Sequence, residues 1–243
     1  MGIILAIIIF GFIVFIHELG HFLLAKFNGI EVQEFSIGMG PKLFGFQRKE
    51  TLYSIRVLPL GGFCAMGEDE SDPCESVGNF NEKSPWRRIS VIAAGPVFNF
   101  VLALIGAIII TAWIGVDRPV VSSIEAGYPA AEAGMQAGDV ITQINGKKIH
   151  LFRDITTFNQ FHQKEEIDLT YERNGKETTV HPKPQWDEKY EMYRYGYSGG
   201  AYTKAGVLET IRYGGSVVRY WISTTLESLK MLVTGQIGME SMS

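Results

Sequence analysis

The sequence predicts a multi-pass α-helical membrane protein with a membrane-associated β-hairpin sheet and an inserted small mixed α/β domain. Three observations predict this fold class. Two apolar segments, 1–27 and 89–114, are each long enough to cross a hydrocarbon core of about 30 Å. The segment between them has strand-like composition, and the polar stretch after them alternates strand and turn signals. The small net charge of −4 gives no indication of a nucleic-acid partner.

The first predicted membrane helix, residues 1–27, carries His17, Glu18 and His21 in the spacing H-E-x-x-H. Residues four apart lie on one face of a helix, so both imidazoles can reach one metal ion while Glu18 flanks the water that the metal activates. The pattern therefore predicts a Zn²⁺ site with His17 and His21 as ligands. No Lys or Arg precedes the apolar run and no small-x-small pattern follows it, which favours a permanent span over a cleaved signal peptide.

The predicted zinc site lies below the membrane surface. His17 is about fourteen residues past a helix start near Ile3, which corresponds to ~21 Å at ~1.5 Å per residue. Ionisable groups without a function are disfavoured there, because each charged group costs about 2.5 kcal/mol or more at the centre of a membrane helix. A site at this depth requires a polar cavity walled by protein, as an active site would provide.

Residues 28–88 form the predicted β-hairpin region. Strand-like segments at 32–39 and 51–58 are separated by a glycine-containing turn over 40–45. The segments hold many apolar residues for a short loop between two spans. Two interpretations stay open: the hairpin dips into the membrane against the zinc helix, or its apolar residues only pack with one another.

Basic residues set the predicted orientation. Lys26 follows the first span. Three more basic residues lie just before the second span over 89–114: Lys83, Arg87 and Arg88. Because cytoplasmic loops are enriched in Lys and Arg, region 28–88 is placed in the cytoplasm, and the N-terminus and everything after the second span are placed outside. Cys64 and Cys74 then face a reducing compartment and are expected to be ordinary thiols.

The polar segment after the second span predicts a small mixed α/β domain over 117–183. Strand-like runs there end at Asn-Gly turns, 145–146 and 174–175. An aromatic linker over 184–204 follows, which either lies at a membrane surface or packs on the domain. Residues 205–235 predict an amphipathic helix, because apolar residues recur with a helical period but are interrupted by charges.

Together, these motifs resemble the site-2 protease family of intramembrane zinc metalloproteases, specifically the bacterial regulator of sigma-E protease type. The pieces that carry the likeness are F-I-H-E-L-G-H-F at 15–22, P-L-G-G-F at 59–63 and A-G-P-V-F-N-F at 94–100. Region 117–183 is similar to a single PDZ domain. The resemblance implies a protease of the bacterial inner membrane that cuts transmembrane segments, such as those of anti-sigma factors, in regulated intramembrane proteolysis. Its PDZ-like domain would lie outside the cytoplasm.

The resemblance also implies a mechanism. Glu18 would accept a proton from the attacking water and return it to the leaving amine, beside a zinc ion that polarises the scissile carbonyl. A helical substrate hides its carbonyls, so an edge of the hairpin over 32–63 could hold an extended substrate by β-augmentation. The candidate substrate-binding residues are Gly61, Gly62 and Asn99. For Asn99, helix packing around Gly95 is favoured slightly over a hydrogen bond to the substrate backbone.

One departure from the family concerns the third zinc ligand. The family takes it from an aspartate in a Leu-Asp-Gly motif on a later membrane helix, and this sequence contains no such helix. The sequence is therefore expected to be an N-terminal portion. The alternative function is a non-catalytic membrane adaptor whose PDZ-like domain binds partners; a metal transporter fits two spans poorly. For the PDZ-like domain itself, a filter against bulky ectodomains is favoured over binding of peptide C-termini.

Overall fold

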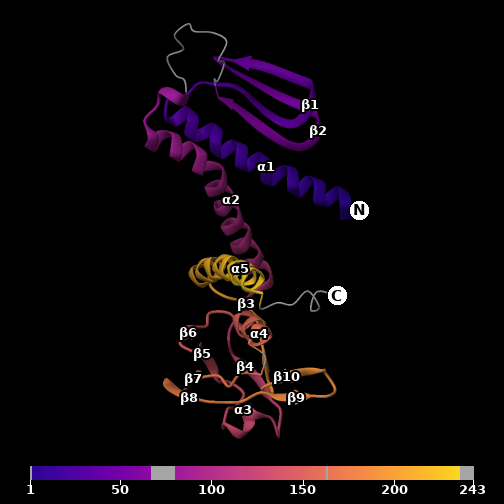
Figure 1. The fold of residues 1–243 in the computed structure, drawn as a ribbon, viewed down its shortest axis with the longest axis vertical. Helices are drawn as coiled ribbons and strands as arrows, with labels where there is room; N and C mark the ends of the chain where they lie inside the picture. The colour runs from indigo at the N-terminus through magenta and orange to yellow at the C-terminus, as the bar shows by residue number, and fades with distance from the viewer. Residues whose placement is uncertain (1, 67–79, 163, 236–243) are drawn as a thin grey trace. The chain divides into compact units, whose positions relative to one another are not determined.

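The protein is described by a computed structural model that covers residues 2–66, 80–162 and 164–235, so Cys74 lies outside the described residues. The chain divides into two compact units, Met1–Ala103 and Leu104–Ser243. Figure 1 shows the elements of each unit along the chain. The predicted metal-binding residues belong to the first unit, and the predicted PDZ-like region belongs to the second.

Among the described residues, two long apolar helices are candidate membrane spans. Helix α1 is Gly2–Phe27, and α2 is Pro85–Ile114, which begins in the first unit and ends in the second. By length and composition, both could cross a membrane. A short 3-10 helix, η1 (Phe80–Glu82), precedes α2. Helix α2 starts four residues before the predicted span because proline is well suited to the first position of a helix.

The hairpin region consists of two long strands, β1 (Val32–Arg48) and β2 (Thr51–Met66). The turn between them is at Lys49 and Glu50, so the predicted turn over 40–45 is wrong. Gly38 and Gly40 have positive φ, yet the strand continues through them and stays paired with β2 across several register shifts. Glycine tolerates such backbone angles inside an irregular strand, which is why these residues do not end it.

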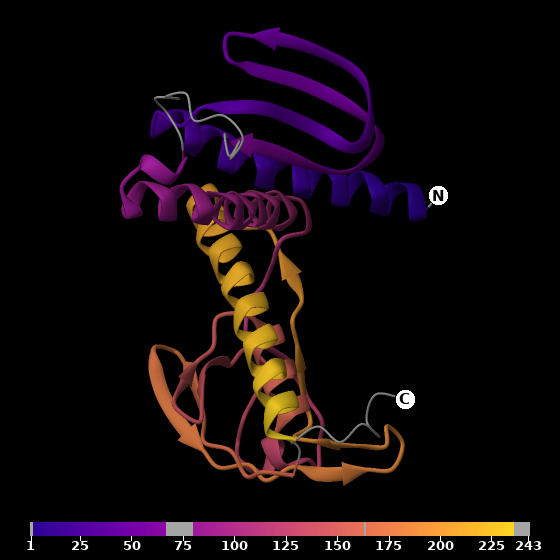
Figure 2. The ribbon, with the colours of Figure 1, turned by 45° about the horizontal axis from the view of Figure 1, so that its top comes forward.

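The sheet doubles back on itself and lies along α1 (Figure 2). Phe35 in β1 pairs with both Tyr53 and Cys64 of β2, so the first half of β1 lies between two parts of β2. The Phe22 ring of α1 packs against the Phe35 ring at 4.9 Å. Cys64 is a free thiol in the structure, as predicted. This packing fixes β2 next to the face of α1 that carries the H-E-x-x-H residues.

In its described residues, 104–162 and 164–235, the second unit contains ten short strands and three helices. The strands are β3 (Val116–Asp117), β4 (Val121–Ile124), β5 (Val140–Ile144), β6 (Lys147–Lys148), β7 (Leu169–Arg173), β8 (Lys176–Val180), β9 (Gln185–Asp187), β10 (Met192–Arg194), β11 (Tyr197–Gly199) and β12 (Tyr202–Thr203). Short α3 (Pro129–Glu132), α4 (Phe152–Phe161) and long α5 (Val207–Thr234) are the helices, besides the end of α2. The main sheet has the order β6-β5-β7-β8. Positive φ values at both Asn-Gly pairs, 145–146 and 174–175, confirm the predicted turns.

Residues 184–204, predicted as an aromatic linker, pack on the rest of the second unit, which is the second of the two interpretations left open by the sequence. They contain four strands: β9 and β10 form a hairpin, β11 pairs with β4, and β12 pairs with β3. Tyr195 is buried in the core of this unit with Ile155 and Leu169. The aromatic residues of this stretch therefore contribute to the folded unit. The pairing partners of β11 and β12 lie more than 70 residues earlier in the chain, which local sequence patterns do not reveal.

Helix α5 is amphipathic, in line with the periodicity of its sequence. Gly214 packs on the last part of α2, since a Cβ built there would be 2.5 Å from a side-chain carbon of Ile108. The helix also exposes apolar side chains, among them Leu208, Ile211, Ile222, Leu226, Leu229 and Val233. The helix ends at Gly235, which caps it in the left-handed conformation.

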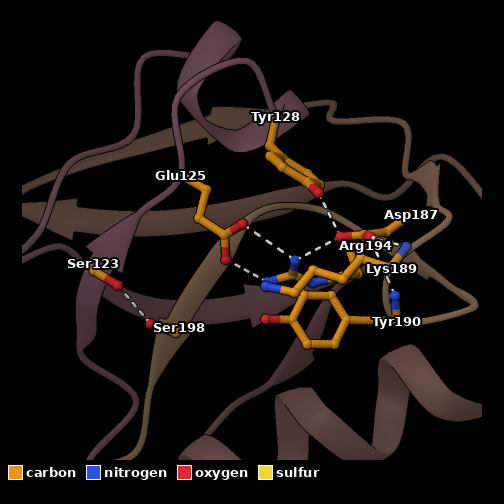
Figure 3. A network of polar contacts seen from close by, with 8 residues as sticks. All are labelled: Ser123, Glu125, Tyr128, Asp187, Lys189, Tyr190, Arg194 and Ser198. Atoms are coloured by element: carbon orange, nitrogen blue, oxygen red, sulfur yellow. Dashed lines mark hydrogen bonds and ion pairs between the residues drawn. The ribbon is translucent and has the colours of Figure 1, made fainter.

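A polar network ties the β9–β10 hairpin to the rest of the second unit (Figure 3). The Tyr128 hydroxyl donates a hydrogen bond to the Asp187 carboxylate, and Arg194 Nη1 donates to the same carboxylate at 2.7 Å. Arg194 also pairs with Glu125. The Tyr128 hydroxyl and then the Arg194 guanidinium stabilise the ionised carboxylate, which lowers the pKa of Asp187 to about 2.

This network predicts a pH-dependent stability for the second unit. Because the pKa of Asp187 is about 2 in the folded chain and about 3.9 in an unfolded one, its stabilising contribution is complete above pH ~4 and is lost as the pH falls through ~2. We expect the urea midpoint, followed by fluorescence in a chain with Trp186 as sole tryptophan, to fall over this range. Asp187→Asn should remove that part of the fall.

The matched control is Asp168→Asn. The Asp168 carboxylate is also paired, with His181, but its side chain is 67% exposed. We expect this variant to keep the acid-induced fall of the wild-type chain. If Asp187→Asn and Asp168→Asn show the same pH dependence, then the network does not stabilise the folded second unit.

Candidate metal centre

The predicted ligands meet on α1. His17 Nε2 and His21 Nε2 are 3.2 Å apart, and the two rings are nearly perpendicular, with centroids 4.8 Å apart. Two ligands at ~2.0–2.1 Å from a tetrahedral zinc ion would be separated by about 3.3 Å. The pair therefore fits two ligands of one zinc ion without rearrangement of the helix.

Helix α2 holds both imidazoles from their other side. His21 Nδ1 donates to the Val91 carbonyl oxygen at 2.7 Å, and Asn99 Nδ2 is 3.2 Å from His17 Nδ1. A hydrogen bond donated by Nδ1–H to a backbone carbonyl oxygen orients an imidazole and leaves its Nε2 lone pair available to a metal. Val91, Gly95 and Asn99 are spaced four apart, so one face of α2 supplies all these contacts.

Gly95 makes room for the two histidines. A Cβ built on this residue would be 2.4 Å from His21 Nε2 and 2.6 Å from His17 Nε2. The sequence suggested helix packing around Gly95. In the structure, the absence of a side chain at Gly95 leaves room for the Nε2 atoms of His17 and His21. The close approach of the helices also involves Gly20, where a Cβ would be 2.7 Å from the Ala94 carbonyl oxygen.

Strand β2 brings the sheet to the glutamate. A Cβ built on Gly62 would be 3.5 Å from Glu18 Cγ, and the backbone of Cys64 is within hydrogen-bonding reach of the Glu18 carboxylate. Gly61 has a positive φ of 83° and faces Met39, not the histidines. Of the predicted substrate-binding residues, Gly62 is thus next to Glu18 and Asn99 is next to His17.

Sequence reasoning missed the contribution of the α2 backbone. The carbonyl that orients His21 belongs to Val91, an apolar residue whose type carries no signal for this role. In the part of the chain that the structure describes, no group of three His, Cys, Asp or Glu side chains converges to hold a metal ion.

These features define a class of protein. A helix of membrane-spanning length carries H-E-x-x-H, its imidazole nitrogens converge, and a carboxylate lies beside them against a strand. This is the arrangement of a membrane metallopeptidase.

The comparison with protein families agrees with this class. The sequence profile of Peptidase family M50 matches residues 5–243. The chain belongs to peptidase family M50, the membrane-bound zinc metalloproteases of the site-2 protease type, which confirms the resemblance seen in the sequence.

Curated relatives carry matching names. A putative zinc metalloprotease of Clostridium acetobutylicum is 42% identical over 242 residues, covering 100% of this chain and 71% of that protein. A putative zinc metalloprotease of Clostridium perfringens is 39% identical, covering 99% of this chain and 71% of that protein. The regulator of sigma-W protease RasP of Bacillus subtilis is 31% identical, covering 98% of this chain and 76% of that protein.

Among solved structures, the chain is similar to the PDZ domain of an SdrC-like protein from Listeria monocytogenes. The match has a TM-score of 0.32 and 21% sequence identity, and it covers 35% of this chain and 90% of that domain.

Proposed function

We propose that the chain is an intramembrane zinc endopeptidase in which His17 and His21 bind Zn²⁺ and Glu18 is the catalytic base. The observation that carries this proposal is the 3.2 Å approach of the two Nε2 atoms on a helix of membrane-spanning length. The names of the relatives support zinc as the metal. Glu18 also lies beside Gly62 of β2, and an edge of a sheet can hold an extended peptide.

The chain's own residues divide the chemistry between them. When bound, zinc supplies a Lewis acid that lowers the pKa of water and polarises a carbonyl. His17 and His21 stay neutral and hold their Nε2 lone pairs toward the metal. Glu18 accepts a proton from the attacking water as the new C–O bond forms, and it delivers that proton to the amine nitrogen as the C–N bond breaks.

The edge of β2 is the proposed binding place for the substrate backbone. Residues 62–65 pair with 34–37 of β1 on one side. Among the described residues, no strand pairs with their other edge. A substrate segment unwound from its helix could add there as a further strand, which would expose its carbonyls beside Glu18. Small residues at Gly61 and Gly62 would let its backbone approach closely.

The exposed side chains of the sheet support its association with the membrane. Leu43, Phe44 and Phe46 are 67%, 62% and 53% exposed. Apolar side chains in this number are costly in water, so contact with lipid is a favourable environment for them. We therefore propose that the hairpin dips into the bilayer, which is the first of the two interpretations left open by the sequence.

Replacing Gly62 by Ala is expected to slow cleavage while zinc binding is retained. The new Cβ would be 2.7 Å from the Ser36 carbonyl oxygen, so β2 must shift relative to β1 and to Glu18. A misplacement of this kind can reduce the rate by about 10–100-fold. The measurement is kcat/KM on a transmembrane peptide together with zinc content. Gly2→Ala is the control, because nothing lies within 4 Å of that Cβ; equal rates for both variants would argue against the role of the β2 edge.

The proposed setting is the bacterial cell membrane. The positive residues between the two apolar helices support a cytoplasmic hairpin region and a PDZ-like region outside the cytoplasm. The substrate class is a membrane protein with a single span, such as an anti-sigma factor; the name of the Bacillus subtilis relative, a regulator of sigma-W protease, supports this class. The PDZ-like region would act as a filter that excludes bulky ectodomains.

Metal and cleavage measurements on the purified protein in detergent test the proposed function. We expect stoichiometric zinc, its loss in His17→Ala, and zinc-dependent cleavage of a transmembrane peptide. The alternative is a membrane adaptor, favoured by the groove between α4 of the PDZ-like region and residues 192–197, which follow that region in the chain. No zinc together with saturable micromolar binding of peptide C-termini, about 8 kcal/mol, would support the adaptor and overturn the peptidase.

A further inference from the structure

The side-chain amide of Asn99 has one polar atom bound and one unbound. Its Nδ2 is 3.2 Å from His17 Nδ1, whereas its Oδ1 is buried and has no hydrogen-bond partner among the residues that the structure describes. A buried, unsatisfied carbonyl oxygen is unusual in a folded protein and calls for an explanation. Oδ1 lies away from solvent and Nδ2 lies against His17 Nδ1, so this side chain contacts His17.

The donors and acceptors of the hydrogen bonds around the two imidazoles follow from the Val91 carbonyl, which can only accept. His21 Nδ1 donates to the Val91 carbonyl, so His21 Nε2 carries a lone pair and accepts from His17 Nε2–H. His17 Nδ1 is then the unprotonated nitrogen, and it accepts from the Asn99 amide. In this arrangement the His17 ring is the Nε2–H tautomer, which cannot offer its Nε2 lone pair to a metal.

Ligation through Nε2 requires the other tautomer of His17. The ring proton must then be on Nδ1, where it needs an acceptor, as metal-bound histidines usually have. Rotation of the Asn99 amide about its Cβ–Cγ bond exchanges the positions of Oδ1 and Nδ2 without a change in volume. Each orientation makes one hydrogen bond to Nδ1 and leaves one polar atom of the amide unpaired, so the exchange between them costs little.

We propose that Asn99 is a positioning residue that selects the tautomer of His17: its amide donates to Nδ1 in the metal-free pair and turns over to accept from Nδ1–H when His17 binds a metal. The ring keeps one proton throughout, which moves from Nε2 to Nδ1. This inference rests on the proposed zinc site and extends it, since it explains why an amide, and not a carboxylate or an apolar residue, lies at this position. A carboxylate can only accept, so it would hold His17 in one tautomer.

The first test is the protonation of the His17 ring in metal-free protein. The protein is labelled with ¹⁵N-histidine, held at pH ~8 so that imidazoles are neutral, and stripped of metal; His17→Gln assigns the signals. We expect Nδ1 of His17 to be unprotonated in the wild-type chain and protonated in Asn99→Asp, whose carboxylate accepts its hydrogen. If the tautomer is the same in both proteins, the proposal is wrong.

The second test is zinc affinity, measured by competition with a chelator in detergent. Asn99→Asp keeps an acceptor for Nδ1–H and should bind zinc within a few-fold of the wild-type chain. Asn99→Leu has no polar atom and should bind about 10–100-fold more weakly, the usual effect of removing a partner of a metal-binding histidine. Equal affinities for wild type, Asn99→Asp and Asn99→Leu would overturn the proposal.

A matched variant controls for folding. Asn28 is a second partly buried amide of the first unit, and its Nδ2 bonds the Leu24 carbonyl and the Ser90 hydroxyl. Asn28→Leu should leave zinc affinity unchanged; an equal loss in both Leu variants would mean a general loss of packing and would overturn the specific role. His17→Ala separates this inference from the proposed function. Unchanged zinc binding in that variant would reject the proposed metal site. The tautomer of His17, measured in metal-free wild-type and Asn99→Asp protein, would still test the role of Asn99.

Discussion

Replacing Glu18 by Gln is expected to abolish cleavage of a transmembrane peptide while zinc binding is kept. Glutamine has nearly the shape of glutamate but cannot accept a proton, and proton transfer by a positioned base contributes about 10²–10⁴-fold to a rate. The side chain also lies against the strand that would hold the substrate, since Gly62 is its close neighbour. The measurement is kcat with saturating peptide, together with zinc content of the same sample.

Glu50→Gln is the control for this variant. Glu50 is a carboxylate of the same unit that pairs with Lys26 near the end of α1, and its side chain is 46% exposed. An exposed pair of this kind contributes little to stability, so the control should retain wild-type activity. Turnover by Glu18→Gln within a few-fold of the control would refute the role of Glu18 as base. Loss of zinc in Glu18→Gln would instead point to a contribution to metal binding.

Replacing Gly95 by Ala is expected to remove both zinc binding and activity. The added Cβ would be 2.4 Å from His21 Nε2 and 2.6 Å from His17 Nε2, well inside the contact distance of carbon and nitrogen atoms. Either the rings must rotate away or α2 must move from α1, and both changes separate the two ligands from one metal position. We expect zinc affinity to fall by about 100-fold or more, beyond the usual effect of an indirect partner.

Gly106→Ala provides the matched control, because it makes the same substitution in the same helix. Nothing lies within 4 Å of a Cβ at Gly106. There the change should leave zinc affinity as it is and raise helix stability slightly, by about 0.5–1 kcal/mol. If Gly95→Ala binds zinc as tightly as Gly106→Ala does, then the histidines do not occupy the space beside Gly95 in the working protein.

Much of the chemistry could be predicted because it depends on local sequence. The four-residue spacing of His17 and His21 fixes their common face once the segment is a helix, and the length of the apolar run makes it one. The Asn-Gly turns were predictable for the same reason, since positive φ at both positions is a property of those residues. The order of the motifs indicated a family resemblance, and the match to peptidase family M50 confirms that resemblance.

The remaining features depend on contacts between distant segments. The backbone carbonyl of Val91 orients His21. Every residue has a backbone carbonyl, so the residue type at this position does not predict the contact. The turn of the hairpin was misplaced because Gly40 is a usual turn residue, whereas here it lies inside a strand whose pairing with β2 outweighs its preference. Within 184–204, β11 and β12 are short strands that pair with β4 and β3, so the sequence of this stretch alone does not indicate them.

The pairing of β3 with β12 has a consequence for how this architecture can be altered. Thr203 pairs with Val116, so the chain enters and leaves the globular module at neighbouring points, directly after α2 and directly before α5. A module with adjoining ends can be exchanged for another, or doubled, without rerouting the helices on either side. The fold thus allows another domain to be grafted at this junction. Chimaeras that carry domains of different sizes would keep the same two splice points.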